Sequence, residues 1–237
     1  MDMFPAATTV DVTDRAPRVA VLPIGSFEQH GPHLPLATDS IVATAIADAV
    51  AARYNVLLLP PVTVSCSHEH AGWAGTVSIS HHTLSAIIED IHTSLASSGI
   101  TALVLVNGHG GNYVLSNIVQ TANASIPRSM SLFPTRTDWD TARVAADLDT
   151  NAHHDMHAGE LEVSILLHVQ PQLVRPGYPD GDHAADERPM LLVDGMRGYT
   201  ETGVIGKPSA ASAGKGQQLL DSLAATFQQH FALLTSQ

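Results

Sequence analysis

The hydrophobic positions of this chain form short continuous runs, separated by longer segments in which they recur every three to four residues. Three of the runs, residues 18–24, 55–59 and 101–106, are almost wholly apolar and have the length of strands. A shorter run follows at 131–133. Because the runs do not alternate between apolar and polar residues, they predict a parallel sheet that is buried on both faces.

The segments between these runs have the apolar spacing of amphipathic helices. One helix is expected to begin at Thr38 or Asp39 and to end near residue 53, and others cover about 83–97, 112–124, 159–169 and 213–234. Strands that alternate with helices predict an α/β fold, here a three-layer arrangement in which helices flank both faces of a parallel sheet.

Three segments have weaker signals. Residues 1–17 are expected to be a loose N-terminal arm, and residues 135–159 are polar and have no clear period. Residues 171–212 are rich in proline and glycine, which predicts extended, loop-rich structure. Because no repeat or linker divides the chain, we expect a single domain over residues 1–237.

Composition and charge narrow the classes of partner. The chain has 11 basic and 23 acidic residues, and its net charge of −12 argues against nucleic acid or an anionic membrane as the main partner. Apolar residues make up 44% and charged residues only 14%, which favours a homo-oligomer. The single Cys66 excludes an internal disulfide. The acidic N-terminus does not resemble a signal peptide and no apolar run has transmembrane length, so we expect a cytoplasmic protein.

Side chains that bind metals follow two of the predicted strands. Glu28, His30 and Asp39 lie in the segment after the first strand, and His109 lies in a glycine-rich turn after the third. Glu28 and His30 are two residues apart, so they point the same way in an extended segment. Functional loops gather at the carboxyl ends of parallel strands, and we therefore expect these side chains at one rim of the sheet.

This set of carboxylates and imidazoles suits one or two divalent ions such as Zn²⁺ or Mn²⁺. Asp39 stands at the start of a helix, where each carboxylate oxygen is able to take one ion, and two ions hold a bridging hydroxide as a nucleophile. Each residue also has a structural interpretation, with Asp39 as a helix cap and His109 as part of a turn. The combination at two neighbouring strand ends favours the metal site.

A fifth ligand is expected from the helix that begins near residue 159. Glu162 shares a stripe with Ile165 and Leu166, where a carboxylate is costly to bury unless it is paired or bound to a metal. Glu160, in the first turn, is either the alternative ligand or a surface residue favoured by the helix dipole. His157 is the candidate for proton transfer, because the pKa of a histidine is normally close to neutrality.

A second histidine-containing loop, residues 65–75, offers His68, Glu69 and His70 as alternative metal ligands, but we interpret it as part of a substrate pocket. We assign His70 and Trp73 to this pocket, although Trp73 is equally interpretable as core packing. Gly110 and Gly111, next to His109, are assigned to the same pocket because they remove side-chain bulk there.

Four segments resemble the creatininase (creatinine amidohydrolase) family, namely Gly25–Asp39, Gly75–Ile79, Asn107–Asn112 and His157–Glu162. The resemblance implies a flavodoxin-related α/β fold, two divalent metal ions, hydrolysis of non-peptide or unusual C–N amide bonds, and frequently a hexamer. It also implies a role for His157 as the acid–base residue and for Asp39 as a bridge between the metals. The residues that match metal ligands of the family are Glu28, His30, Asp39 and His109.

One position departs from the family pattern. Creatininases proper carry a metal-binding glutamate where this chain has Gly111, which strengthens the assignment of Glu162 and makes creatinine a less fitting substrate. The chain is also similar to the branch that contains the mycofactocin precursor peptidase and the formamide hydrolases. Trp73–Thr76 and Glu201–Gly206 look most like the peptidase, whereas Ser67–His70 fits it less well.

Residues and resemblance together predict a metal-dependent amidohydrolase. Two divalent ions (Zn, Mn or Fe) are expected to carry a hydroxide that attacks the carbonyl carbon of a small cyclic amide, formamide or short peptide. His157 then delivers the proton to the leaving nitrogen. Two alternatives stand beside this function: a mycofactocin precursor peptidase that releases a C-terminal dipeptide, and a non-catalytic metal-binding assembly protein with the same fold.

Overall fold

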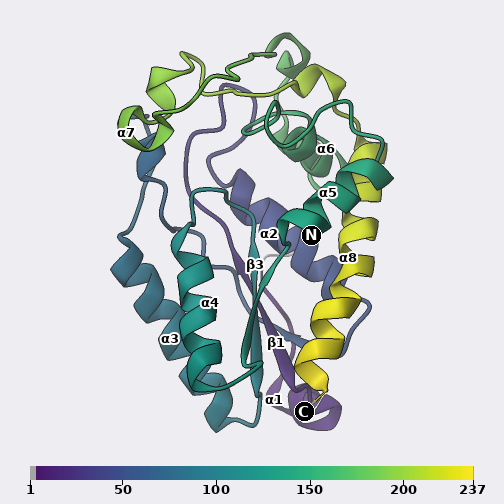
Figure 1. Cartoon of the computed structure of the whole chain (residues 1–237). Coiled ribbons are helices and arrows are strands. Elements are labelled where there is room, and N and C mark those ends of the chain that lie inside the picture. The colour runs from purple at the N-terminus through teal and green to yellow at the C-terminus, as the bar shows by residue number, and fades with distance from the viewer. Residues whose placement is uncertain (1–3, 237) are drawn as a thin grey trace.

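The structure, a computed structural model, describes residues 4–236 and contains one four-stranded parallel sheet in the order β2-β1-β3-β4. Each strand begins and ends within one or two residues of the apolar run that predicts it. The strands, which form the centre of Figure 1, are Val19–Ile24 (β1), Val56–Leu58 (β2), Ala102–Asn107 (β3) and Met130–Phe133 (β4).

Helices connect and cover these strands. The long ones are Thr38–Ala51 (α2), His81–Ser97 (α3), Val114–Ser125 (α4), Arg136–Ala145 (α5), Glu160–Val169 (α6) and Ala213–Thr235 (α8). The short ones are Thr9–Arg15 (α1), Leu191–Asp194 (α7) and the 3₁₀ turns His68–His70 (η1), Pro171–Leu173 (η2), Tyr178–Asp180 (η3), Met196–Gly198 (η4) and Pro208–Ala210 (η5).

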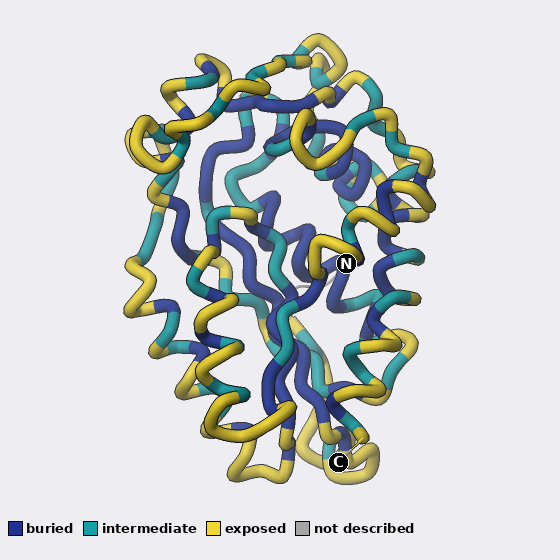
Figure 2. Tube along the Cα trace, in the orientation of Figure 1, coloured by how far each residue is buried: buried dark blue, intermediate teal, exposed yellow. Residues whose placement is uncertain are grey.

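Alternate residues of the strands face opposite layers of helices, as the pleat of a strand requires. In β1, Val19 and Val21 belong to the core beneath α2, α5, α6 and α8, whereas Ala20 and Leu22 belong to the core beneath α3 and α4. The sheet is buried along its length and the outer surfaces of the helices are exposed (Figure 2). The predicted three-layer α/β architecture is therefore confirmed.

Three α-helices lie in segments for which no helix was expected: the four-residue α7, and the longer α1 and α5. In α5, the Asp138 carboxylate accepts a hydrogen bond from Thr135 N (2.8 Å), and Asp138 N donates to Thr135 Oγ1 (3.3 Å). Thr8 and Asp11 make the same capping box at α1, inside the predicted loose arm. Aspartate in place of the usual Glu or Gln satisfies the free N–H groups of the first turn, and this Thr-x-x-Asp spacing is the signal that marks both helices.

The order of the strands determines where the functional loops meet. β1 and β3 are neighbours, and the chain leaves them toward opposite edges of the sheet, so the crevice above their carboxyl ends is the topological switch point. The start of α2 packs directly against both strand ends. A Cβ at Gly25 would lie 2.3 Å from Ser40 N, and one at Gly108 would lie 2.4 Å from Asp39 O. The two glycines thus allow Asp39 to stand over the gap between the strands.

In the part of the chain from residue 4 to residue 236, no helix has the length and apolar character needed to cross a bilayer.

Candidate metal centre

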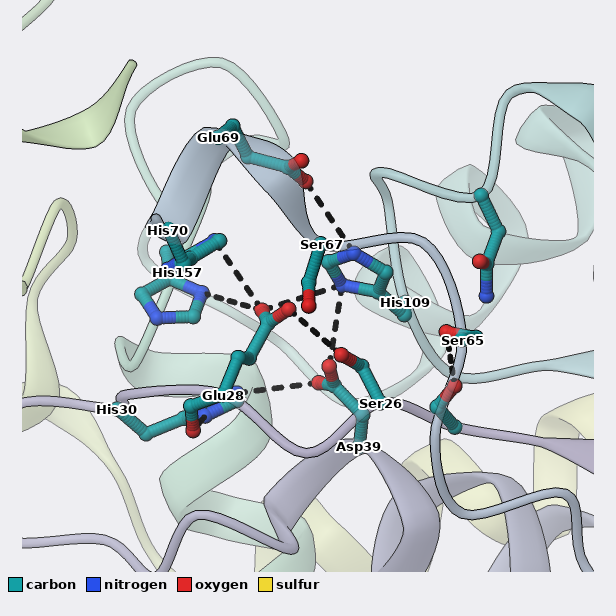
Figure 3. Close-up of polar contacts among 12 residues, drawn as sticks. Ser26, Glu28, His30, Asp39, Ser65, Ser67, Glu69, His70, His109 and His157 are labelled. Carbon is teal, nitrogen blue, oxygen red and sulfur yellow. Dashed lines mark hydrogen bonds and ion pairs between the residues drawn. The ribbon is translucent and has the colours of Figure 1, made fainter. Parts of the chain in front are cut away.

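Four side chains predicted as metal ligands converge at the carboxyl ends of β1 and β3. Glu28 and His30 come from the loop after β1, Asp39 from the first turn of α2, and His109 from the turn after β3. All four are at most 5% exposed. Figure 3 shows them pointing toward one another, so the expectation of one shared rim holds for these residues.

Asp39 lies at the centre of this cluster. Its Oδ1 is 3.0 Å from His30 Nε2, and its Oδ2 is 3.0 Å from His109 Nδ1. The described residues contain four sets of three possible ligands, and the ligand atoms within each set lie within 4.8 Å of one another. Two of the sets include Asp39, namely Glu28–Asp39–His109 and His30–Asp39–Glu162, and the other two are Glu28–His30–His157 and Glu28–Glu69–His70.

The other ring nitrogen of each histidine is held by a backbone carbonyl. His30 Nδ1 is 3.1 Å from Glu28 O, and His109 Nε2 is 3.0 Å from Cys66 O. A carbonyl only accepts hydrogen bonds, so both of these nitrogens carry hydrogen. The nitrogens that face Asp39 are then the ones whose lone pairs are able to bind a metal ion, which is how outer hydrogen bonds orient ligating histidines.

The charges of the cluster favour cations at its centre. Burial lowers the pKa of His30, but the Asp39 carboxylate outweighs burial and raises that pKa to about 9. Burial likewise opposes protonation of His109, and the carboxylates of Glu28 and Asp39 nevertheless raise its pKa well above the usual value. Burial, and next the charge of Asp39, raises the pKa of Glu28. Protons thus hold positions between carboxylates that metal cations are suited to occupy.

Two buried oxygens of the cluster lack a hydrogen-bond donor. Within residues 4–236, neither Glu28 Oε1 nor Asp39 Oδ2 receives a hydrogen bond of good geometry, although both atoms are inaccessible to solvent. Buried carboxylate oxygens without donors are costly, because they have lost water without gaining a partner. Oxygens and imidazole nitrogens in this arrangement are the donor set that Zn²⁺ and Mn²⁺ accept, so the residues fit a divalent metal centre.

The two glutamates of α6 have different environments. Glu162 is 16% exposed, and its Oε2 lies 3.9 Å from His30 Nε2 and accepts a hydrogen bond from Ala158 N (2.6 Å). Burial, and next the charge of Asp39, raises the pKa of Glu162 to about 7 even though His30 opposes the shift. Glu162 is therefore the α6 carboxylate that reaches the cluster.

Glu160 is fully buried, and its interpretation as a surface residue is wrong. Its carboxylate accepts hydrogen bonds from Asp149 N (3.0 Å), from the backbone and hydroxyl of Thr150 (3.0 and 2.7 Å), and from Lys215 Nζ (2.6 Å). With both oxygens occupied, Glu160 ties α6 to α8 and to the loop before α6. The sequence did not reveal this role because α6 is buried on nearly all sides, which removes the contrast between faces.

His157 lies beside the cluster rather than between its carboxylates. Its backbone pairs with Ile205, its Nε2 donates to Gln29 O (2.7 Å), and its Nδ1 is 3.9 Å from Glu28 Oε1. Burial, and next the charges of His30 and His70, lowers the pKa of His157 well below the usual value. The imidazole is consequently neutral near pH 7, with the Nδ1 lone pair facing the cluster.

A carboxylate from another loop occupies the space that the glycine at position 111 leaves open. Glu69 comes from η1, and its Oε1 lies 3.2 Å from His109 Nε2. A Cβ on Gly111 would lie 1.8 Å from Glu69 Oε1 and 2.4 Å from His109 Nε2. A side chain at position 111 and the observed position of Glu69 thus exclude each other. The sequence favours a pocket-lining position for Glu69 over its alternative as a ligand, because this contact joins segments that are far apart in the chain.

Two cavities lie on either side of the cluster. One, of about 300 Å³, is lined by Gly110, His157 and Glu162 among others. The other, of about 480 Å³, is lined by Glu69, Gly111, Tyr113 and neighbouring residues. Trp73 lines neither of these two cavities, since its ring is covered by the Arg197 guanidinium 4.6 Å away.

His70, the remaining residue assigned to the pocket, is buried beside the cluster with Nε2 3.1 Å from Glu28 Oε1. Burial, followed by the charge of His109, lowers the pKa of His70 to about 3. Of the predicted pocket residues, His70, Gly110 and Gly111 are adjacent to the cluster or its cavities, whereas Trp73 is not.

The parallel sheet, its switch-point crevice and the buried carboxylate–histidine cluster define a three-layer α/β protein with a centre suited to divalent metals. A family model described as "Creatininase: Creatinine amidohydrolase" matches residues 6–231. The chain therefore belongs to the creatininase family, and it is an amidohydrolase that acts on carbon–nitrogen bonds.

Several known proteins are similar to this chain. The mycofactocin precursor peptide peptidase of Mycobacterium tuberculosis is 34% identical over 233 residues, which cover 92% of this chain and 86% of that protein. The creatinine amidohydrolase of Pseudomonas putida is 28% identical over 225 residues, covering 86% and 84%. A crystal structure of creatinine amidohydrolase (creatininase) matches the fold with a TM-score of 0.79 at 24% identity, over 97% of this chain and 98% of that one.

Proposed function

We propose that this protein hydrolyses the C–N amide bond of a small cyclic amide, a formamide or a short peptide at a centre of two divalent metals bridged by Asp39. Glu28 and His109 would hold one ion with Asp39, and His30 and Glu162 would hold the other. The observation that carries this proposal is the position of Asp39, whose two oxygens each lie 3.0 Å from a histidine of a different ligand set. A carboxylate that serves two sets is the expected bridge of a dinuclear site.

Metal ions bound there activate water and polarise the carbonyl group of the substrate. His157 is the acid–base residue: its neutral Nδ1 takes a proton from the attacking water and gives it to the leaving nitrogen. Burial of the cluster excludes bulk water and strengthens the electrostatic contacts that these residues make with the substrate. The neighbouring cavities provide room for the groups on the two sides of the scissile bond.

The ligand assignment is tested by neutralising single carboxylates without changing their size. Glu28→Gln and Asp39→Asn are expected to lose bound metal and amidase activity, because each removes a charge that the cations require. Metal content is measured by elemental analysis after purification without added metal. Glu89→Gln and Asp90→Asn, both on the exposed side of α3, are matched controls that should keep metal and activity. Full metal occupancy in the Asp39→Asn variant would show that the ligands are assigned wrongly.

A peptide substrate is the second candidate, favoured by the 34% identity to mycofactocin precursor peptide peptidases, which exceeds the 28% identity to creatinine amidohydrolase. The assay compares creatinine, formamides and a precursor peptide with a C-terminal Val-Tyr unit. Release of the C-terminal dipeptide identifies the peptidase. Stoichiometric metal without turnover of any of these compounds would instead support a non-catalytic assembly protein.

We infer zinc, manganese or iron as the native metal. The proposal is supported by the donor set and by related solved structures, one a mutant creatininase of "Zn-Zn type" and one "Creatininase Mn". A homo-oligomer is supported by the low charge content and by Leu192 and Val193 on α7, which are 78% and 79% exposed, and the resemblance to the family suggests a hexamer. A cytoplasmic location and a single domain over residues 1–237 stay predictions.

A further inference from the structure

The side chain of Gln29 lies between His70 and His157, the two histidines next to the Glu28 carboxylate. Its amide group has a fixed orientation. Oε1 accepts a hydrogen bond from Gly31 N (2.9 Å), and Nε2 donates one to Gly203 O (3.2 Å). A backbone N–H only donates and a carbonyl only accepts, so these two contacts determine which end of the amide is the nitrogen. The residue is 5% exposed, and no swap of the two ends is compatible with both contacts.

The backbone of Gly203 packs closely against this amide. Gly203 has φ +94°, which favours glycine, and a Cβ there would lie 1.7 Å from Gln29 Oε1. The Gln29 side chain therefore rests directly on the backbone of the segment that also pairs with His157. Its side chain contacts Gly31 in its own loop and His70, His157 and Gly203 in three other segments of the chain.

The fixed amide determines the tautomer of His70. Gln29 Nε2 lies 3.0 Å from His70 Nδ1, and an amide nitrogen only donates. His70 Nδ1 therefore carries no hydrogen, and the hydrogen of the neutral ring is on Nε2. The backbone of Gln29 determines the tautomer of His157 in the same way. Its carbonyl oxygen lies 2.7 Å from His157 Nε2, which must donate, and Nδ1 is left as the acceptor. Gln29 Nε2 also lies 3.2 Å from His157 Nε2, but its two hydrogens go to Gly203 O and His70 Nδ1, so these two nitrogens do not share a hydrogen bond.

The two histidines are thus in the same tautomer but turn opposite atoms toward the metal cluster. His70 presents the Nε2–H donor, 3.1 Å from Glu28 Oε1, and His157 presents the Nδ1 acceptor, 3.9 Å from the same oxygen. Their ring centroids are 4.6 Å apart. Among residues 4–236, no hydrogen bond of good geometry reaches that oxygen, so the donor of His70 is not committed to it. A proton donor and a proton acceptor therefore face the same carboxylate oxygen of the cluster.

We propose that His70 is a second catalytic residue, whose Nε2–H donates a hydrogen bond to the carbonyl oxygen of the scissile amide, and that Gln29 is the positioning residue that keeps the hydrogen there. This inference rests on the proposed amidohydrolase function. As the water oxygen bonds to the carbonyl carbon, His157 Nδ1 takes one proton and the carbonyl oxygen gains negative charge next to His70 Nε2–H. The C–N bond then breaks, the nitrogen receives the proton from His157, and a carboxylic acid and an amine leave.

The tautomers are measured directly in the zinc-loaded protein by ¹⁵N NMR of the histidine rings, which distinguishes protonated from unprotonated nitrogens. In the wild type, both His70 and His157 are expected to carry hydrogen on Nε2. Gln29→Glu keeps the acceptor for Gly31 N but removes the donor to His70, so the hydrogen of His70 should move to Nδ1. His157 should not change, because it is held by the backbone carbonyl of residue 29.

The catalytic role is measured on the amide that the wild type hydrolyses in the substrate panel. His70→Ala is expected to lower kcat by about 10²–10³-fold with little change in KM, since the lost donor acts on charge that develops in the transition state. Gln29→Glu should lower kcat by a similar factor, and the double variant should be no slower than His70→Ala alone, because the two residues act as a unit. Zinc content and thermal unfolding are measured for each variant, and His82→Ala, an exposed position on α3, is the control.

A His70 hydrogen on Nδ1 in the wild type, or an undiminished kcat in zinc-loaded His70→Ala, would overturn the inference. So would a further loss when Gln29→Glu is added to His70→Ala. A fully loaded wild type that hydrolyses no amide contradicts the proposed function itself, and with it the role of His70. Failure of the His70 inference is distinguishable from failure of the proposed function, because only the former occurs with a wild type that hydrolyses an amide.

Discussion

Replacing Gly111 by alanine tests how tightly the metal centre depends on the empty space at that position. The backbone of Gly111 is outside the left-handed region, so alanine meets no conformational barrier there and the whole effect comes from contact. The new Cβ would lie 1.8 Å from Glu69 Oε1 and 2.4 Å from His109 Nε2, and both side chains must move. Overpacking of a filled site costs about 1–3 kcal/mol. Displacing Glu69 from His109 adds about 1.5–3 kcal/mol, the range for hydrogen bonds to charged groups.

We therefore expect Gly111→Ala to lower the free energy of unfolding by about 3 kcal/mol, taking the lower part of both ranges because Glu69 is flexible. For a chain of this size, that corresponds to a fall in Tm of roughly 6–12 °C. The assay is thermal and urea unfolding of metal-free protein, which separates packing from metal loading. In a Glu69→Ala background the same substitution should cost about 1–2 kcal/mol less, since only the His109 contact remains. An equal cost in both backgrounds, or no change in Tm, would refute this reasoning.

Two further predictions concern charge. Lys215→Met should destabilise the protein by about 2–3 kcal/mol. This is less than the loss of a fully buried ion pair costs, because Lys215 Nζ is partly exposed beside Glu160. Lys207→Met, at an exposed position, is the control, and a change of Tm below 2 °C in Lys215→Met would contradict the role of this ion pair. Zinc binding to metal-free protein at pH 7 should release at least two protons. His30 has a pKa of about 9 and that of His109 is also raised, so both rings lose hydrogen to the metal, and Glu162, with a pKa of about 7, loses part of a third proton. Calorimetry in buffers of different ionisation enthalpy measures this release, which should decrease above pH 9; release of no proton would mean that these histidines are not ligands.

The alternation of strands and helices could be predicted from the sequence because it depends on local pattern alone. Each apolar run is long enough for one strand and is bounded by polar or proline-containing segments, as in Asn55 to Pro60. The rim shared by Glu28 and His109 followed from the rule for parallel strands, without any knowledge of contacts. Helix α5 was not predicted because its capping box uses aspartate and its apolar stripe is short.

The parts of the site that sequence reasoning missed depend on contacts between distant segments. Glu160 has the pattern of an exposed first-turn residue, but Lys215, 55 positions later in the chain, forms an ion pair with it. Glu69 lies against His109, and Gln29 lies between His70 and the Gly203 segment, 174 residues away. In each case the residue type is common on surfaces, and only the tertiary partner distinguishes a buried functional side chain from a solvated one.

The two ligand sets around Asp39 require different lengths of the chain during synthesis. Glu28, Asp39 and His109 are all present once residue 109 has been added, and β1, α2 and β3, which position them, are then complete or nearly so. The second set waits for Glu162, which is 53 residues later. At ribosomal rates of about 5–20 residues per second, this delay is roughly 3–10 s. Helix α6 packs mainly against α8, the last helix of the chain, so Glu162 is held in place only after translation ends. A nascent chain thus contains the proposed ligands for one ion well before it contains the proposed ligands for two.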